Sequence, residues 1–170
     1  MKRIVILLNV ILMVQLASSQ SLNFNSQEQI DSFQVNYPGL TECGYIWISG
    51  NDIYNLDSLS TITSIYSFLV IDQCDNLSSL SGLQNLSYIG ITAGLGFGLW
   101  INDCDALKNL NELNGLAEIE GRIMIYSNDS LKSLSGLDNL LTVGDGLFIE
   151  YNSSLKSISS LSNLSTIGFS

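Results

Sequence analysis

The fold is decided by the repeating stretch of residues 123–146, which reads IMIYSNDSLKSLSGLDNLLTVGDG. It begins with an apolar-x-Ile triplet, Ile123-Met124-Ile125, and places Asn128 three residues after the second Ile. Apolar side chains then recur at every third position, at Leu131, Leu134, Leu137, Leu140 and Val143. A self-similar unit of this length is typical of repeat architectures, in which stacked copies bury one continuous core.

The same triplet recurs on both sides of this stretch. Leu99-Trp100-Ile101 precedes it and Leu147-Phe148-Ile149 follows it at the same interval, a period of about 24 residues. Farther upstream, Ile46-Trp47-Ile48 and Leu69-Val70-Ile71 are separated by nearly the same interval. The interval from Leu69 to Leu99 is longer, because the repeat between them contains extra residues. We therefore expect five repeats over residues 46–170.

The spacing within each repeat predicts its local structure. A triplet that alternates as a strand does points its two outer residues inward and its middle residue outward. The three-residue spacing that follows favours tight turns or 3₁₀ segments over an α-helix, whose apolar stripe has a 3.6-residue period. Stacking then aligns the leucines in two columns, Leu77, Leu107, Leu131 and Leu155 in one, and Leu83, Leu113, Leu137 and Leu161 in the other. The predicted fold class is mainly β, a β-solenoid.

Residues 20–45 differ from the repeats and predict an N-terminal cap. Asn25 and Glu28 form a capping pair for a short helix, and Pro38-Gly39 ends it. The helix would carry three apolar side chains on one face: Ile30, Phe33 and Tyr37. Residues 147–170 complete an ordinary repeat with no comparable segment, so the C-terminal cap is expected to be missing here and more chain to follow Ser170.

The first residues predict export. Lys2 and Arg3 precede an apolar run over residues 4–14, and the small residues Ala17, Ser18 and Ser19 follow. This is the pattern of a secretory signal peptide over residues 1–19, so we expect a secreted or cell-surface protein. The run is shorter than the roughly 20 apolar residues that span a bilayer, and no membrane-spanning segment is expected elsewhere.

The charge and composition exclude several classes of function. The sequence has 16 acidic and 6 basic residues and no histidine. A strongly negative surface repels nucleic acid, and the lack of histidine removes the commonest general base and metal ligand. We expect no nucleic-acid partner, no cofactor and no catalytic residue.

Several stretches resemble receptor L-domain proteins, relatives of the L domains of the insulin and epidermal growth factor receptors. They are FNSQ at 24–27, NYPGLTE at 36–42, IWISG at 46–50 and the LSGLxNL units at 80–86 and 134–140. The resemblance implies a right-handed β-solenoid with leucine-rich-repeat-like turns and ligand recognition by the sheet face. It implies no catalytic residue, and the dense cysteine pattern around the receptor L domains is lacking.

The outward residues of the triplets predict a ligand-binding face. They form an apolar column of five: Trp47, Val70, Trp100, Met124 and Phe148. A polar column flanks it, made of Ser49, Asp72, Asn102, Tyr126 and Glu150. Contiguous exposed apolar surface marks interaction sites, and Trp and Tyr are enriched in binding hot spots. The alternative is that further chain or the 91–97 loop covers the apolar column and makes it a second small core.

The extra residues of the second repeat contain the pattern Gly94-x-Gly96-x-Gly98. No helix signal follows, so a phosphate-binding loop is not expected. We interpret the segment as a protruding loop. Leu95 and Phe97 on this loop either pack over the adjacent turns or add contacts to a ligand at the sheet face.

Two further columns have competing interpretations. Cys74 and Cys104 take the inward ladder position held elsewhere by Asn51, Asn128 and Asn152, either as buried thiols or as a disulfide between neighbouring strands. Cys43 is not expected to pair with Cys74, and is either free or paired with further chain. The residues after the ladder position are Asp52, Asp75, Asp105 and Asp129. Each Asp either caps its own turn or contributes to a calcium site.

A recognition module for a protein or glycan ligand is the function that these observations favour. The alternative is a structural or adhesive surface array, although such arrays repeat the same small residue and the columns here vary in size and charge. A carbohydrate-active enzyme would need acids and bases clustered on one face, and the basic residues are too few.

Overall fold

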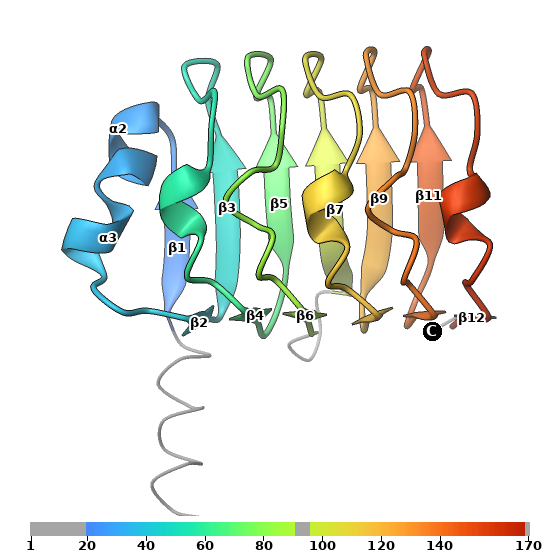
Figure 1. Ribbon diagram of the computed structural model, residues 1–170, viewed down its shortest axis with the longest axis horizontal. Coiled ribbons are helices and arrows are strands. Elements are labelled where there is room, and N and C mark those ends of the chain that lie inside the picture. The colour runs from blue at the N-terminus through green and yellow to red at the C-terminus, as the bar shows by residue number, and fades with distance from the viewer. Residues whose placement is uncertain (1–19, 91–95, 169–170) are drawn as a thin grey trace, which may run out of the picture.

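The computed structural model describes residues 20–90 and 96–168 (Figure 1). The fold is mainly β, with two sheets of parallel strands and few helices. The predicted signal peptide and Leu95 lie outside the described residues.

The first sheet, here called the long sheet, contains the five predicted triplets. Its strands, in spatial order, are β1 (Ser21–Phe24), β3 (Tyr45–Ser49), β5 (Leu69–Asp72), β7 (Phe97–Asn102), β9 (Arg122–Tyr126) and β11 (Leu147–Glu150). Each triplet is in register with the next, as Ile46 with Leu69 and Leu69 with Leu99. Strand β1 was not predicted from the sequence; it pairs Leu22 with Ile46 and extends the sheet by one strand.

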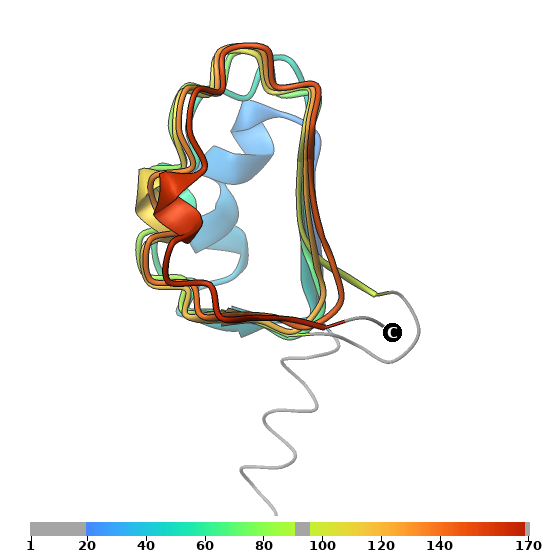
Figure 2. The same cartoon turned by 90° about the vertical axis from the view of Figure 1, so that its right-hand side faces the viewer.

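The second sheet, here called the short sheet, consists of two-residue strands. They are β2 (Glu42–Cys43), β4 (Ser64–Ile65), β6 (Tyr88–Ile89), β8 (Glu118–Ile119), β10 (Thr142–Val143) and β12 (Thr166–Ile167). Each of the first five precedes a long strand, and the chain turns a corner between them, with Gly44 alone separating β2 from β3. Viewed along the stack, successive repeats nearly superimpose (Figure 2).

The wall opposite the long sheet alternates between two kinds of turn. Three 3₁₀ helices, η1 (Asp57–Leu59), η2 (Asn111–Leu113) and η3 (Ser159–Leu161), occur in every other repeat. In the repeats between them, Gly82 and Gly136 adopt positive φ angles of 106° and 111° at the corresponding place. The leucine spacing therefore produces both of the predicted local structures, in alternation.

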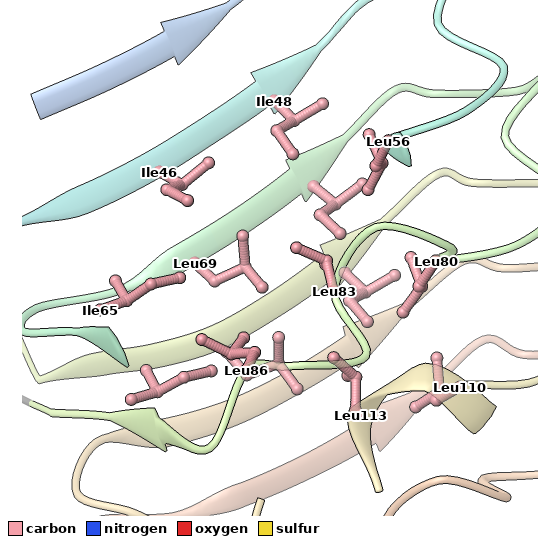
Figure 3. Packing of buried hydrophobic residues seen from close by; sticks show 14 of the residues in the cluster. Ile46, Ile48, Leu56, Ile65, Leu69, Leu80, Leu83, Leu86, Leu110 and Leu113 are labelled. Carbon is pink, nitrogen blue, oxygen red and sulfur yellow. The ribbon is translucent and has the colours of Figure 1, made fainter. Parts of the chain in front are cut away.

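The core lies between the walls and runs through the stack (Figure 3). The inward triplet residues of the first four repeats, such as Ile46 and Ile48, are fully buried. The leucine columns are also fully buried as far as Leu131 and Leu137. In the last repeat Leu155 and Leu161 are only half-buried, because no further described repeat covers them.

The predicted helical cap is present as two short helices, α2 (Gln27–Asp31) and α3 (Phe33–Asn36). The predicted capping pair was wrong by one residue: Ser26 is the N-cap and accepts a hydrogen bond from the backbone N–H of Gln29. The Gln29 side chain in turn accepts from the backbone N–H of Asn25 at 2.6 Å. The helices bury Ile30 and Phe33 against the first turn of the core.

Candidate functional site

The long sheet aligns the predicted apolar column on its outer face. Trp47 is in register with Val70, Val70 with Trp100, Trp100 with Met124, and Met124 with Phe148. Trp47, Trp100 and Met124 are half-buried, and Phe148 is 40% exposed. The apolar column is therefore partly accessible to solvent at every position except that of Val70.

Val70, predicted to be exposed, is only 1% exposed, so this prediction was wrong. The reason lies in the two tryptophans that flank it. Strands β3 and β7 are about 9.6 Å apart, at twice the usual spacing of neighbouring strands. The ring centroids of Trp47 and Trp100 are nevertheless only 6.5 Å apart. The indoles must therefore lean toward each other over β5, where Val70 lies between them.

Three more rings extend this contact into what we call the aromatic cluster: Tyr45, Trp47, Phe68, Phe97 and Trp100. Tyr45 stacks on Phe68 at 4.7 Å, Phe68 meets Phe97 edge-on at 6.3 Å, and Phe97 stacks on Trp100 at 5.7 Å. Tyr45 and Phe68 were not predicted as site residues from the sequence. Each precedes a residue of the apolar column by two positions, and strand alternation could have placed both on the outer face.

Phe97 belongs to strand β7, so its prediction as a loop residue was wrong. Phe97 pairs with Arg122 and Leu99 pairs with Ile123, which leaves Gly98 as the extra residue of a bulge. A bulge changes the alternation by one residue, and Phe97 therefore shares the outer face with Trp100. A Cβ at Gly98 would lie 2.6 Å from the Ile119 side chain, so only glycine fits this position.

The predicted polar column is also in register, from Ser49 through Asp72, Asn102 and Tyr126 to Glu150. Asn102 Nδ2 donates to Asp72 Oδ1 at 2.8 Å and to Asp103 Oδ2 at 3.0 Å. Asp103 was not predicted as a site residue from the sequence; its φ of 49° turns the chain at the end of β7. One amide therefore holds two carboxylates beside the aromatic cluster.

The polar column and Asp103 form an acidic border beside the aromatic cluster. Burial raises the pKa of Tyr126, and the negative charge of Glu150 raises it further. Arg122, at the opposite end of β9, forms an ion pair with Asp145. Among the described residues this is the only ion pair, so Asp72, Asp103 and Glu150 form none with a described residue.

The indole Nε1 of Trp100 is buried and has no hydrogen-bond acceptor among the described residues. An unpaired buried donor destabilises the folded state by about 1–3 kcal/mol. Within the described residues, the aromatic cluster therefore contains one buried donor that is left unsatisfied.

The ladder position, the inward Asn or Cys three residues after each triplet, differs from its prediction in the first repeat. Asn128 Nδ2 donates to the carbonyls of Ile101 and Tyr126, and Asn152 takes the same role one repeat later. Asn51 is instead exposed. Its repeat has one residue fewer between the strand residue Ile48 and Ile53, which takes the place that Leu77 holds after Ile71 in the next repeat.

Cys74 and Cys104 hold the ladder position as buried free thiols, and Cys43 is also buried and free. The contact with Cys74 raises the pKa of Cys104, and burial raises it further. Burial alone raises the pKa of Cys43 to about 12. These values leave Cys43 and Cys104 protonated, and hence poor nucleophiles, near neutral pH.

The Asp column makes contacts between repeats. Asp52 accepts from the backbone N–H of Gln27, Asp105 from that of Asp129, and Asp129 from the Ser153 hydroxyl. The expectation that these three carboxylates cap their own turns is therefore wrong, since the donors belong to adjacent segments. Within the described ranges, no group of three or more His, Cys, Asp or Glu side chains is arranged to hold a metal ion.

Comparison with known proteins identifies the family. The family model of the receptor L domain matches residues 43–131, which is just over half of the chain. Searches of curated proteins and of solved structures find no match. Receptor L domains are ligand-binding modules in the extracellular parts of receptors, and they bind protein ligands.

Over the described residues, no helix has the length and apolar character needed to cross a membrane. The matched region begins at Cys43 in β2 and includes strands β3, β5, β7 and β9, with the whole aromatic cluster. The chain therefore belongs to the receptor L domain family.

Proposed function

We propose that the chain is a non-catalytic extracellular recognition module that binds a protein or glycan ligand at the outer face of its long sheet. The aromatic cluster and Met124 and Phe148 form the apolar part of this binding face. The polar column, with Asp103, forms its border. The repeats would stack as a right-handed β-solenoid, and the signal peptide would direct export.

One observation carries the proposal. The inner face of the long sheet already supplies the core, yet its outer face also gathers large rings, including both tryptophans of the sequence. Large apolar side chains that gather on an accessible surface typically mark an interaction site. Tryptophan and tyrosine are also the residue types that most often dominate binding energies.

The proposal is tested with purified protein and the concentrated extracellular fluid of its source. Captured material is compared between the wild type and the single variants Trp47→Ala and Trp100→Ala. Tyr66→Ala and Tyr88→Ala are the matched controls, because these half-buried rings lie at the short sheet. Circular dichroism verifies that each variant is folded.

We expect both tryptophan variants to lose the captured ligand and both tyrosine variants to retain it. A loss of at least tenfold in affinity corresponds to about 1.4 kcal/mol or more, which exceeds the roughly 1 kcal/mol that most interface residues contribute at most when truncated. Equal capture by all four folded variants would contradict the proposed binding face.

A further inference from the structure

The apolar and acidic parts of the binding face are close enough for one ligand to contact both. In each strand the apolar-column residue and the polar-column residue are two positions apart, which is about 6.6 Å along a strand. Trp100 and Asn102 on β7 are one such pair, and Val70 and Asp72 on β5 are another. A single extended side chain spans this distance.

The acidic border has unmet capacity for hydrogen bonds. The Asn102 amide satisfies one oxygen of Asp72 and one oxygen of Asp103. Within the described part of the chain, the second carboxylate oxygen of each has no donor and neither residue forms an ion pair. Two carboxylates held by one amide repel each other, and a cation placed between them would remove that repulsion and form charge-assisted hydrogen bonds.

The rings favour the same chemistry. Ammonium and guanidinium groups are attracted to the face of an indole ring, and arginine also stacks on it. Trp47 and Trp100 are half-exposed beside the acidic border. The whole chain carries a net charge of −10, so an acidic partner would be repelled at long range and a basic partner would be attracted.

We propose that the ligand of this face is a protein segment rich in Lys or Arg. Its cations contact Asp72, Asp103 and Glu150, and its apolar side chains contact the aromatic cluster, Met124 and Phe148. This inference rests on the proposed function and names the chemistry of its ligand. The apolar column spans five strands, roughly 19 Å, which suits a peptide segment better than a single small amine.

The two tryptophans make the test direct. They are the only two in the sequence and both lie in the binding face, so the tryptophan emission of the protein reports this face alone. The probes are four: a synthetic peptide of alternating Arg and Leu, its Ser–Leu and Glu–Leu counterparts, and the neutral glycan maltoheptaose. Each is titrated into the full chain while emission is recorded.

The test variant is Asp72→Asn with Asp103→Asn, which removes two charges but keeps an acceptor for Asn102. The matched control is Glu42→Gln with Glu120→Gln. These carboxylates accept hydrogen bonds from the hydroxyls of Tyr66 and Tyr88 at the short sheet, and glutamine retains an acceptor oxygen for each. Both double variants have the same net charge, and thermal unfolding by circular dichroism verifies their folding.

We expect the Arg–Leu peptide to change the emission and to bind at least tenfold more tightly than the Ser–Leu peptide. The Asp72/Asp103 variant should weaken that binding about tenfold and the Glu42/Glu120 variant less than twofold, because only the former charges lie at the face. High salt should weaken binding to the wild type, which tests the charge contribution without any substitution.

Three results would overturn the inference. Equal weakening by the two double variants would mean that the peptide is attracted by net charge alone. Binding of the Ser–Leu peptide or of maltoheptaose at least as tight as that of the Arg–Leu peptide would exclude a basic ligand, yet it would support the proposed binding face. An unchanged emission with the Arg–Leu peptide would refute the inference, while the extracellular capture assay would still decide the proposed function.

Discussion

At the scale of single residues, two glycines determine how closely neighbouring repeats approach. A Cβ at Gly136 would lie 1.7 Å from the carbonyl oxygen of Leu110, and one at Gly82 would lie 1.8 Å from that of Leu56. Both glycines also have φ angles that L side chains rarely adopt. The two Ser-Gly-Leu turns therefore pack against the Leu that precedes η1 or η2 in the repeat before.

Gly136→Ala tests this close approach. Gly39 is the matched control, since its φ is also positive, at 73°, but nothing lies within 4 Å of a Cβ placed there. We expect Gly39→Ala to lower the free energy of unfolding by about 1 kcal/mol, the cost of a left-handed alanine. Gly136→Ala should lower the free energy of unfolding by several kcal/mol more, because the backbone at Leu110 or at residue 136 must move to admit the Cβ. Chemical denaturation measures both values, and equal costs would show that the repeats adjust freely.

The ladder position explains why Asn and Cys are interchangeable there. Asn128 Nδ2 donates to Ile101 O and Tyr126 O, and Cys104 Sγ contacts the corresponding carbonyls of Ile71 and Asn102 at 3.8 and 3.3 Å. Both side chains are small and carry a donor, which is what buried carbonyls require. The amide adds an acceptor for the backbone N–H of Cys104 at 3.0 Å, which a thiol provides only weakly.

At the scale of elements, the short sheet carries a pair of hydrogen-bonded tyrosines. Tyr66 donates to Glu42 at 2.7 Å and Tyr88 to Glu120 at 2.8 Å, and the two rings meet edge-on at 6.0 Å. Burial raises the pKa of each tyrosine to about 12, and the hydrogen bond to its glutamate contributes in the same direction. These contacts join β2 to β4 and β6 to β8 through side chains.

The raised pKa values predict a loss of stability in alkali. The native state holds these two protons up to about pH 12, whereas the unfolded chain releases them near pH 10. The contribution is therefore complete below pH 10 and is lost as the pH rises from about 10 to 12. Tyr66→Phe with Tyr88→Phe should make stability fall less steeply in this interval. Denaturation at several pH values, with tyrosinate absorbance as a second readout, tests this; an unchanged slope would contradict it.

The strands were predictable from sequence to different degrees. The triplets became β3, β5, β7, β9 and β11 because alternation of apolar residues is a local property of a strand. Strand β1 was missed because Ser21–Phe24 has no apolar-x-Ile triplet and becomes a strand by pairing with β3. The bulge at Gly98 was also missed, because it depends on the register between β7 and β9.

At the scale of the whole molecule, one core connects nearly every element. The three cysteines lie in it at 0% exposure, Cys43 near the N-terminal helices and Cys74 and Cys104 in the second and third repeats. A continuous core stacked from repeats couples each repeat to its neighbours. The cysteines therefore report whether the first half of the stack opens as a unit.

We expect a thiol reagent to label all three cysteines at one rate under native conditions, equal to the rate of global unfolding, because each side chain is inaccessible until the core opens. Mass spectrometry of peptides from a labelling time course measures each rate. Faster labelling of Cys43 alone would show instead that α2, α3 and β2 open separately from the repeats.

The sequence by itself determined the period, the strand triplets, the inward leucines and the receptor L domain resemblance. These depend on the spacing of residues near one another in the chain, which strand and turn geometry translates directly into faces. For the same reason it placed Trp47, Trp100, Met124 and Phe148 on one outer face before any contact was known.

Only the tertiary structure decided how that face is built. Val70 is covered because two indoles from β3 and β7 lean over β5, and Phe97 joins them because a bulge turns it outward. Asp103 meets Asp72 through the Asn102 amide, although the two carboxylates belong to different repeats. These contacts join side chains of different strands, which come together only when the chain folds. The spacing of residues within one strand therefore does not predict them.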